Sequence, residues 1–401
     1  MIRSGGSSNF QRLLIGAVLA GLAMVGPAQA NSASFVRSLW PEAERAGVSR
    51  QAFDAAFASY NPIPQVIELT QKQPEFTQTV QQYVDKRVTA AQAAKGQAMR
   101  GEWAQTLAGA EQRYGVQPEI VLAIWGMETN FGGFMGGNNT IHALATLTEK
   151  GYRASFFRSE LVTALRIVSD GHIAPNAMVG SWAGAMGHTQ FMPSSFMRYA
   201  VDYNGDGRKD IWNSVPDALG STANYLKSFD WRPGETWGYE VKLPQGFNFA
   251  AAREMGKAPL SQWQAMGISR ASGSAFPRPG DMARLYMPAG ASGPAFLLLP
   301  NFDVIKRYNN SDSYALAVGH LADRILGGGS FVTPWPSGDY ALNKAQRAEV
   351  QSLLGRAGFN VGTADGVVGP KTRAGVIAYQ QARGLAADGH VSGLLLERLK
   401  R

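Results

Sequence analysis

The 401-residue sequence contains no cysteine, and only 17% of its residues are charged. The absence of cysteine excludes disulfide bonds, cysteine-ligated zinc, iron–sulfur clusters, a cysteine nucleophile and a lipid attached through cysteine. The sequence also lacks the motifs of zinc hydrolases, P-loop enzymes, dinucleotide-binding domains and serine hydrolases of the nucleophile-elbow type. Hydrophobic residues make up 45% of the chain, which is enough for a folded core, and the length predicts two or more domains.

The net charge of +8 is concentrated at the two ends of the chain. Residues 1–30 carry +2, residues 31–340 carry +1 and residues 341–401 carry +5. A basic segment attracts an anionic partner such as a nucleic acid, a membrane surface or an acidic polymer. The charge therefore indicates a binding unit over residues 341–401 and leaves the long middle of the chain close to neutral.

The first 30 residues have the pattern of a secretory signal peptide. Arg3 and Arg12 precede an apolar run over residues 13–25, and Ala28 and Ala30 form a small-x-small cleavage site. The run is shorter than the ~20 apolar residues of a membrane span, so an uncleaved anchor is the less favoured alternative. We expect cleavage after about Ala30 and a soluble mature chain outside the cytoplasm, which disfavours a nucleic-acid partner.

A buried central helix is the most distinct element that the sequence predicts. Apolar residues recur at helical spacing between residues 35 and 130. Pro118 opens one helix at a position where proline is tolerated, and the residues from Ile120 to Met127 are almost all apolar. This helix is predicted to end at Gly132 and Gly133. We expect further helices over 155–170, 216–229 and 314–326, and an irregular region with short strands over 232–300.

The C-terminal part of the sequence predicts a separate small domain. Residues 330–340 contain two prolines and follow a run of three glycines, so they are predicted to be a linker. Residues 341–401 contain two similar segments, 364–369 and 387–393, each with an Asp-Gly pair that suits a turn. Helices around these turns predict a three-helix domain, and a coincidence of common turn residues is the alternative explanation of the similarity.

Glu128 is the strongest candidate for a catalytic residue. It is the only acid between Glu119 and Glu149, and it directly follows the apolar run of the predicted central helix. Burial raises the pKa of a carboxyl group, and a carboxyl group that is protonated near neutral pH can act as a general acid. The alternative is a solvent-facing or salt-bridged glutamate at a helix end, and this residue alone does not decide between them.

Residues 202–213 have the spacing of an EF-hand calcium loop, with glycine at the sixth position. The candidate ligands are oxygen donors: Asp202, Asn204, Asp206, Arg208 through its backbone carbonyl, and Asp217. The twelfth position is Asn213 instead of the usual glutamate, and Asp217 is the candidate for the missing carboxylate. A structural calcium ion and an Asx-rich turn without metal are equally favoured.

Two longer motifs lead to a known family. They are Trp125 to Gly132 (WGMETNFG) and Ser181 to Phe196 (SWAGAMGHTQFMPSSF), and both resemble the motifs of the lytic murein transglycosylase B family. The loop that begins at Asp202 and the segments 223–226 and 307–315 follow in the order of that family. The resemblance covers residues from about 35 to 326.

The C-terminal segment resembles a second family, the small peptidoglycan-binding module. The similar segments are 350–354 (VQSLL), 365–372 (DGVVGPKT), 379–380 and 384–385. The module often has phenylalanine where Tyr379 stands. The resemblance implies that the charge of +5 on this segment meets an anionic wall polymer.

Together the two resemblances imply a mainly α (α+β) chain. They imply a signal peptide over 1–30, a lysozyme-like catalytic domain over 31–329 that includes the loop 202–213, a linker over 330–340 and a three-helix peptidoglycan-binding domain over 341–401. Family members can be anchored through a lipid on cysteine, which this sequence lacks, so the implied form is soluble and periplasmic, without a membrane anchor.

The implied activity is that of a lytic transglycosylase, a carbon–oxygen lyase acting on polysaccharide. Such an enzyme cleaves the β-1,4 bond between N-acetylmuramic acid and N-acetylglucosamine in peptidoglycan and leaves 1,6-anhydromuramic acid ends. By this resemblance Glu128 acts as general acid and then base, and no cofactor is required for catalysis. The attacking group is the sugar's own C6 hydroxyl, which removes the need for the second carboxylate of typical glycosidases. A lysozyme-type muramidase that uses water and a non-catalytic wall-binding scaffold remain the alternatives.

The resemblance also implies the substrate-binding residues, which are Ser181, Gln190, Tyr225, Asn309, Tyr314 and Tyr83. Ser181, Gln190 and Asn309 would bind the sugars and orient the acetamido group, and Tyr225 and Tyr314 would shape the subsite around Glu128. Tyr83 lies in a segment with few identities to the family. The implied partners are peptidoglycan glycan strands and proteins of cell-wall synthesis or remodelling, and no nucleic acid.

Overall fold

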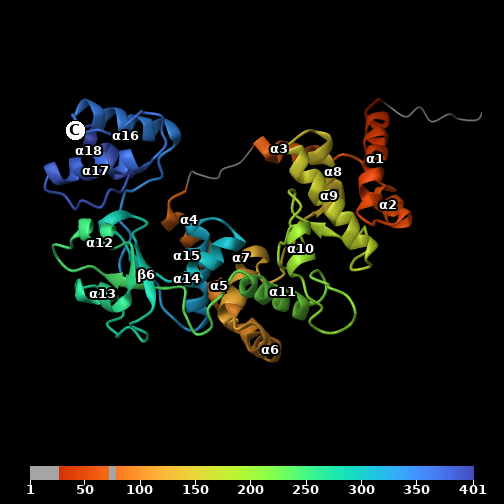
Figure 1. The fold of residues 1–401 in the computed structure, drawn as a ribbon, viewed down its shortest axis with the longest axis horizontal. Coiled ribbons are helices and arrows are strands. Elements are labelled where there is room, and N and C mark those ends of the chain that lie inside the picture. The colour runs from red at the N-terminus through yellow and green to blue at the C-terminus, as the bar shows by residue number, and fades with distance from the viewer. Residues whose placement is uncertain (1–26, 72–77) are drawn as a thin grey trace, which may run out of the picture.

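The computed structural model describes residues 27–71 and 78–401, and helices make up most of its secondary structure (Figure 1). The predicted mainly α fold with short strands is therefore confirmed. The signal-peptide prediction falls largely on residues 1–26, which lie outside the described residues, and it stays a prediction. Within the described ranges, no helix is both long and apolar enough to cross a membrane.

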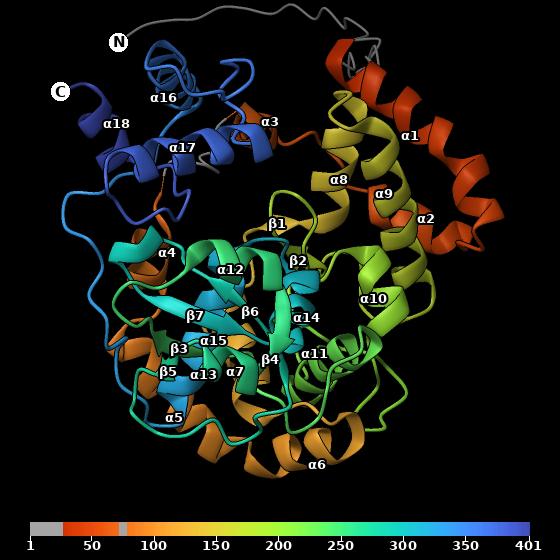
Figure 2. The ribbon, with the colours of Figure 1, turned by 60° about the vertical axis from the view of Figure 1, so that its left-hand side comes forward.

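The described part of the chain begins with seven helices: α1 (Pro27–Arg45), α2 (Arg50–Phe57), α3 (Pro64–Gln71), α4 (Val80–Arg87), α5 (Ala90–Glu102), α6 (Ala104–Tyr114) and α7 (Pro118–Thr129). Four more follow: α8 (Thr140–Glu149), α9 (Ala154–Ser169), α10 (Pro193–Tyr199) and α11 (Val215–Ser228). Two short strands, β1 (Asn138–Asn139) and β2 (Val179–Gly180), pair antiparallel between them. Helices α1, α2, α8 and α9 form one end of the molecule (Figure 2).

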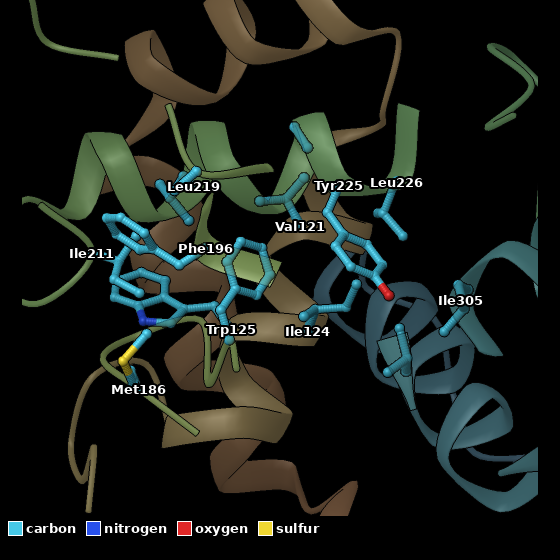
Figure 3. Close-up of a cluster of buried hydrophobic side chains, with 14 of the residues drawn as sticks. Val121, Ile124, Trp125, Met186, Phe196, Ile211, Leu219, Tyr225, Leu226 and Ile305 are labelled. Atoms are coloured by element: carbon cyan, nitrogen blue, oxygen red, sulfur yellow. The ribbon is translucent and has the colours of Figure 1, made fainter. Parts of the chain in front are cut away.

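Helix α7 lies at the centre of the largest hydrophobic core, as its apolar sequence predicts. Every residue from Ile120 to Gly126 is buried, and α7 packs against α5, α6, α11 and α15. Figure 3 shows Val121, Ile124 and Trp125 of α7 facing side chains from α10, α11 and α14. A helix that is apolar on all faces has to be packed on all faces, and the surrounding helices provide this packing.

The Gly- and Pro-rich region 232–300 folds into more regular structure than its sequence predicts. Its strands are β3 (Gly238–Lys242), β4 (Lys257–Pro259), β5 (Ser269–Arg270), β6 (Met282–Tyr286) and β7 (Ala295–Leu298). They form one antiparallel sheet in the order β4-β6-β7-β3-β5. Helices α12 (Phe249–Met255) and α13 (Leu260–Ala265) and the 3-10 turn η1 (Gly290–Ser292) complete the unit, whose own core is centred on Trp263 and Leu297.

The chain then returns to the helical core through α14 (Pro300–Tyr308) and α15 (Asp312–Ile325). The predicted linker 330–340 has no helix or strand, but its first residues are attached to the body. Phe331 stacks on His320 with ring centroids 3.9 Å apart, and the amides of Val332 and Thr333 donate to the Glu240 carboxylate. The first residues of the segment are therefore held against α15 and β3.

The C-terminal residues fold into three helices, as predicted: α16 (Lys344–Arg356), α17 (Pro370–Ala382) and α18 (Gly393–Leu399). The two Asp-Gly segments form equivalent turns. The Gly366 amide donates to the side-chain Oε1 of Gln351, and the Gly389 amide donates to the side-chain Oε1 of Gln380. In both turns the aspartate Oδ1 accepts the amide two residues later. This shared geometry makes the sequence similarity a structural repeat rather than a coincidence.

The second turn also joins the three-helix unit to the sheet. The Oδ2 atom of Asp388 accepts the amide of Ala291 at 2.7 Å, and Arg253 donates to the Ala387 carbonyl at 2.8 Å. A Cβ atom at Gly290 would approach the Asp388 carboxylate to 2.6 Å, so the contact requires glycine there.

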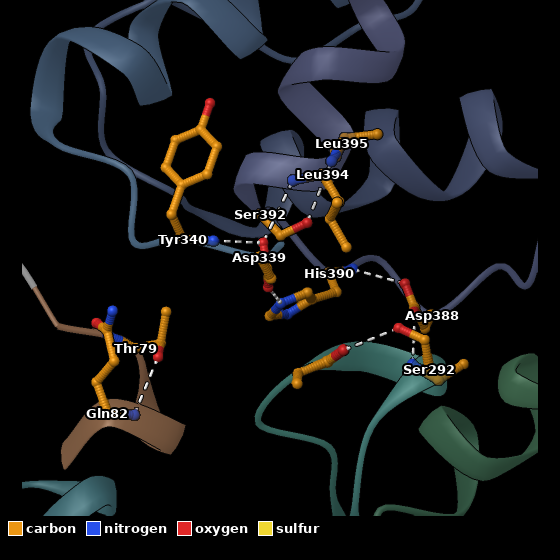
Figure 4. A network of polar contacts seen from close by, with 12 residues as sticks. Thr79, Gln82, Ser292, Asp339, Tyr340, Asp388, His390, Ser392, Leu394 and Leu395 are labelled. Atoms are coloured by element: carbon orange, nitrogen blue, oxygen red, sulfur yellow. Dashed lines mark hydrogen bonds and ion pairs between the residues drawn. The ribbon is translucent and has the colours of Figure 1, made fainter. Parts of the chain in front are cut away.

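Asp339 closes the other side of this junction (Figure 4). Its carboxylate accepts the amides of Tyr340 and Leu394 and lies 4.0 Å from the His390 ring. Asp339 at the end of the linker therefore bonds the three-helix unit next to the Asp388 turn, which contacts the unit that contains the sheet.

Candidate active site

The end of α7 carries Glu128 and is shaped by an unusual turn. Asn130, Phe131 and Gly132 follow with φ values of +53°, +55° and +74°, so three successive residues are left-handed. The helix ends at Thr129, earlier than the predicted glycine stop, because Asn130 and Phe131 already leave the helical conformation. Left-handed residues other than glycine carry strain, and strained turns are concentrated at functional sites.

Glycine is required at Gly132 because a Cβ atom there would collide with the His188 ring. The Thr129 hydroxyl accepts the Gly132 amide at 3.0 Å and donates to the His188 carbonyl. The indole N–H of Trp125 donates to Nδ1 of His188 at 3.0 Å. Burial lowers the pKa of His188, so the ring is neutral and can accept this bond at neutral pH. The histidine has a structural role, because its contacts with Trp125 and Thr129 fix the second motif against the end of α7.

Glu128 is half-buried and accepts a hydrogen bond of 2.6 Å from the Tyr314 hydroxyl on its Oε1 atom. Burial raises the pKa of Glu128 to about 7, and the bond from Tyr314, which favours the carboxylate, offsets part of that rise. At neutral pH the group therefore populates both its acid and its base form. The geometry supports the catalytic reading of Glu128 over a salt-bridged helix end, because no ion pair to it occurs within the described residues.

Tyrosines surround the carboxyl group. Tyr314 is 2% exposed, and the negative charge of Glu128 raises the pKa of Tyr314, Tyr308 and Tyr83 in addition to burial. Tyr83 of α4 therefore lies within range of the electrostatic field of Glu128, although the segment around Tyr83 has few identities to the family. Its ring also carries the Arg87 guanidinium 3.7 Å from the centroid.

Tyr225 is buried behind this group. Its hydroxyl donates to the Arg307 carbonyl, and its ring centroid lies 4.9 Å from that of Tyr308. Burial raises the pKa of Tyr225 to about 12, so the hydroxyl stays protonated. Tyr225 extends from α11 toward the α14 side of the core in Figure 3. Tyr225 thus supports Tyr308, and through it the wall of the site.

Gln190 and Ser181 lie on the loop between β2 and α10, which is bonded to the end of α7 through His188. The Gln190 side-chain amide donates to the carbonyls of Met135 and Gly187, and its own backbone has φ +52°. Within the described residues its side-chain oxygen accepts no hydrogen bond, so it is available to a donor. The Ser181 hydroxyl accepts the amides of Ala183 and Ala185 and retains its proton for another acceptor.

Asn309 directly follows Tyr308 at the end of α14 and is exposed. Its side-chain amide makes no hydrogen bond within the described part of the chain, so both its donor and its acceptor are free. No recorded contact joins Ser181 or Asn309 to Glu128. The structure thus joins Glu128 and Tyr314 by a hydrogen bond, places Tyr83 within range of the Glu128 charge, and connects Gln190 through the loop.

Tyr308 is a site residue that the sequence analysis did not select. Its hydroxyl donates to the Thr189 carbonyl at 2.6 Å, which links α14 to the loop beside Gln190. The signal that could have found it was its position inside the motif 307–315, directly before Asn309.

The loop 202–213 is folded by its own oxygen atoms. Asp202 accepts the amides of Gly205, Asp206 and Gly207, and Asp206 accepts the amide of Arg208. Asp202, Asn204, Asp206 and the Arg208 carbonyl have the donor chemistry that calcium prefers. Nevertheless, in the described ranges no group of three or more acidic or histidine side chains is arranged to hold a metal ion.

Asp217, the candidate for the missing carboxylate ligand, is hydrogen-bonded to the backbone of the loop. It is fully buried, and its two carboxylate oxygens accept the amides of Tyr203, Asn204 and Asp210. The carboxylate therefore anchors the two ends of the loop on α11.

Comparison with known proteins gives two family matches. Residues 31–323 match the transglycosylase SLT domain, and residues 343–399 match a peptidoglycan binding domain. Over 249 residues the chain is 37% identical to the membrane-bound lytic murein transglycosylase B of Escherichia coli (strain K12). That match covers 61% of this chain and 66% of the relative, so the chain spans slightly less than two thirds of the relative's length.

Solved structures show the same fold. SltB3 of Pseudomonas aeruginosa, in complex with NAG-anhNAM-pentapeptide, has a TM-score of 0.84 and 44% identity over 92% of this chain and 99% of that one. SltB3 has also been solved with NAG-NAM-pentapeptide. The Escherichia coli lytic transglycosylase Slt35, in complex with calcium, has a TM-score of 0.59 and 32% identity over 74% of this chain and 92% of that one.

Proposed function

Since the chain belongs to the transglycosylase SLT family, we propose that it is a lytic transglycosylase of the bacterial cell wall. It cleaves the β-1,4 bond between N-acetylmuramic acid and N-acetylglucosamine in peptidoglycan and leaves 1,6-anhydromuramic acid ends. The observation that carries this proposal is the Glu128 carboxyl group, with its pKa of about 7 and its bond from Tyr314. A group that is part acid and part base at neutral pH can serve both halves of the reaction.

In the first half, protonated Glu128 gives its proton to the glycosidic oxygen. The bond between that oxygen and C1 of the muramic acid breaks, and the N-acetylglucosamine leaves as an alcohol. The 2-acetamido group stabilises the positive charge at C1. In the second half, the Glu128 carboxylate takes the proton of the C6 hydroxyl, and the C6 oxygen bonds to C1. Atoms and charge balance, and Glu128 ends protonated as it began.

This mechanism explains why one carboxylate suffices. Glycosidases that use water place two carboxylates about 5 to 9.5 Å apart on either side of the bond. The causes of the raised pKa of Glu128 are burial and the Tyr314 bond, and no second carboxylate contributes among the described residues. An internal hydroxyl reacts without a separately activated water because it is already held beside C1.

The proposed sugar contacts follow from the free polar groups. The side-chain oxygen of Gln190, the hydroxyl proton of Ser181 and the exposed amide of Asn309 are available to hydroxyl and acetamido groups. Tyr314 orients Glu128 directly, and Tyr225 acts from behind by supporting Tyr308. Tyr83 lies within range of the Glu128 charge, which raises the pKa of Tyr83 in addition to burial, and we propose that it also contacts the substrate.

We place this activity in the periplasm, with residues 1–30 removed as a signal peptide. The domains would be the catalytic unit over 31–329, the linker over 330–340 and the wall-binding unit over 341–401, whose charge of +5 favours an anionic wall. Glycan strands are the substrate, and proteins of wall synthesis or remodelling are the proposed partners.

A calcium ion at the loop 202–213 is a second proposal. The Slt35 complex with calcium and the oxygen donors Asp202, Asn204, Asp206 and Arg208 support it. Such an ion would stabilise the loop and take no part in the reaction, which Glu128 carries alone.

The products of purified peptidoglycan test the activity, with mass spectrometry as the readout. Anhydromuramic acid ends support the transglycosylase, whereas reducing muramic acid ends would identify a muramidase that uses water. Intact glycan after incubation with the folded protein would instead support the alternative that the protein is a non-catalytic wall-binding scaffold.

A further inference from the structure

Two phenylalanines follow Glu128 in one glycine-rich loop, and they have opposite environments. Phe131 is 6% exposed and packs edge-on against Trp125 with ring centroids 5.6 Å apart. Phe134 is 71% exposed, more than any other large hydrophobic side chain among the described residues. A single exposed apolar side chain is ordinary on a protein surface. Phe134 differs from the other exposed apolar residues because it lies six positions after Glu128, in the loop that follows α7.

The backbone that presents Phe134 is firmly held. Its amide donates to the Thr129 carbonyl at 3.0 Å, and the next carbonyl, that of Met135, accepts the side-chain amide of Gln190 at 3.0 Å. The preceding left-handed turn is fixed by the contact between Gly132 and His188. The exposure of the ring is therefore a feature of a fixed loop and not of a loose one.

These bonds also locate the backbone segment that carries the ring. Thr129 is the neighbour of Glu128, and Gln190 is one of the proposed sugar contacts, so Phe134 lies between two parts of the site. The opposite side of the turn is closed by Lys95, which donates to the Asn130 carbonyl at 2.7 Å. The exposed ring is therefore carried by a backbone segment that is bonded on one side to the residue next to Glu128 and on the other side to Gln190.

We propose that Phe134 binds the apolar C–H face of a sugar ring in the glycan strand held at Glu128. The proposal rests on the proposed function and adds a binding residue to that site. A flat aromatic face suits the flat apolar face of a pyranose, and it contributes binding without taking part in proton transfer. The contact acts on substrate affinity and leaves the chemical step to Glu128.

Steady-state kinetics on soluble glycan strands test the proposal with Phe134→Ala, Phe134→Trp and the control Phe156→Ala. Phe156 is an exposed phenylalanine on α9, and its removal should leave both constants unchanged. Phe134→Ala should raise KM about tenfold with kcat within about twofold, which is the effect of one aromatic contact. Phe134→Trp should retain a KM near that of the unchanged protein. An unchanged KM in Phe134→Ala, or an equal rise in Phe156→Ala, would overturn the proposal.

Binding of the same strands to Glu128→Gln and to Glu128→Gln/Phe134→Ala separates this proposal from the proposed function. Isothermal titration calorimetry on these two variants reports affinity without any reaction. A weaker Kd of about tenfold in the double variant supports the role of Phe134 whichever product the active protein makes. Equal Kd values refute that role even if anhydro products are found.

Discussion

The Tyr314 hydroxyl donates a 2.6 Å hydrogen bond to Oε1 of Glu128, across 186 positions of sequence. The two residues come from different helices, since Glu128 ends α7 and Tyr314 lies in the first turn of α15. The Ser311 side chain caps that turn by accepting the Tyr314 amide. Burial raises the pKa of the carboxyl group and the tyrosine bond lowers it, and the balance of about 7 suits an acid that must later act as a base.

Tyr314→Phe removes the bond that lowers the pKa of Glu128, so this pKa should rise above about 7. Because protonated Glu128 is the acid, the alkaline limb of kcat/KM against pH should move upward by about one pH unit. The profile between pH 5 and 9 measures this shift. Tyr308→Phe is the control, since its hydroxyl bonds the Thr189 carbonyl instead. A limb that stays in place or moves to lower pH in Tyr314→Phe refutes the assigned role.

Gly132→Ala should destabilise the protein and reduce its activity together. The new Cβ atom would meet the His188 ring at a residue whose φ is +74°. We expect the free energy of unfolding to fall by about 2 kcal/mol. Gly137→Ala in the same loop has open space around its Cβ position and should stay within about 0.5 kcal/mol. Equal stabilities in urea denaturation would show that the loop is not fixed as described.

Asp388→Ala should loosen the three-helix unit from the sheet, because it removes the acceptor of the Ala291 amide. Small-angle X-ray scattering should then show a larger radius of gyration. Asp365→Ala is the matched control, because Asp365 makes the equivalent turn without contacting the sheet. The loss of one such bond costs about 1 kcal/mol. The double variant Asp388→Ala/Arg253→Ala, which removes both bonds, should therefore give a larger increase in the radius of gyration. A radius that changes equally in Asp365→Ala would contradict the docking role.

Calcium should raise the melting temperature if it binds the loop 202–213. Excess calcium over its Kd stabilises the folded state, by about 2.7 kcal/mol at a hundredfold excess. Asp206→Asn keeps an oxygen to accept the Arg208 amide but removes one charge, so it should reduce the shift. Differential scanning fluorimetry with calcium and with chelator provides the readout. Identical melting temperatures with calcium and with chelator would show that the loop is an Asx-rich turn that binds no calcium.

The sequence predicts those parts of the fold that local pattern determines. Pro118 and the apolar run after it specify a buried helix, and the Asp-Gly pairs specify two turns, which the structure confirms. The order of the five strands over 238–298 depends on pairings across the chain, so glycine and proline content alone could not give it. The attachment of Phe331 to His320 could not be predicted either, because it is a tertiary contact between the proline-containing linker and a helix.

The candidate site divides in the same way. Burial of the Glu128 neighbours was predictable from the apolar run, and so was the possibility of a raised pKa. The family resemblance implied that Tyr314 shapes the subsite around Glu128, but the hydrogen bond between them could not be predicted, because no local pattern joins residues 186 positions apart. The role of Asp217 could not be predicted, since its three amide donors come from both ends of the loop.

The most direct test of the central claim is mass spectrometry of peptidoglycan digested by the protein and by Glu128→Gln. We predict muropeptides with 1,6-anhydromuramic acid ends, each lighter by one water than the corresponding hydrolysis product. The same products should form about 10² to 10⁴ times more slowly with Glu128→Gln, because the general acid is lost. Reducing muramic acid ends, or an undiminished rate in Glu128→Gln, would contradict the account.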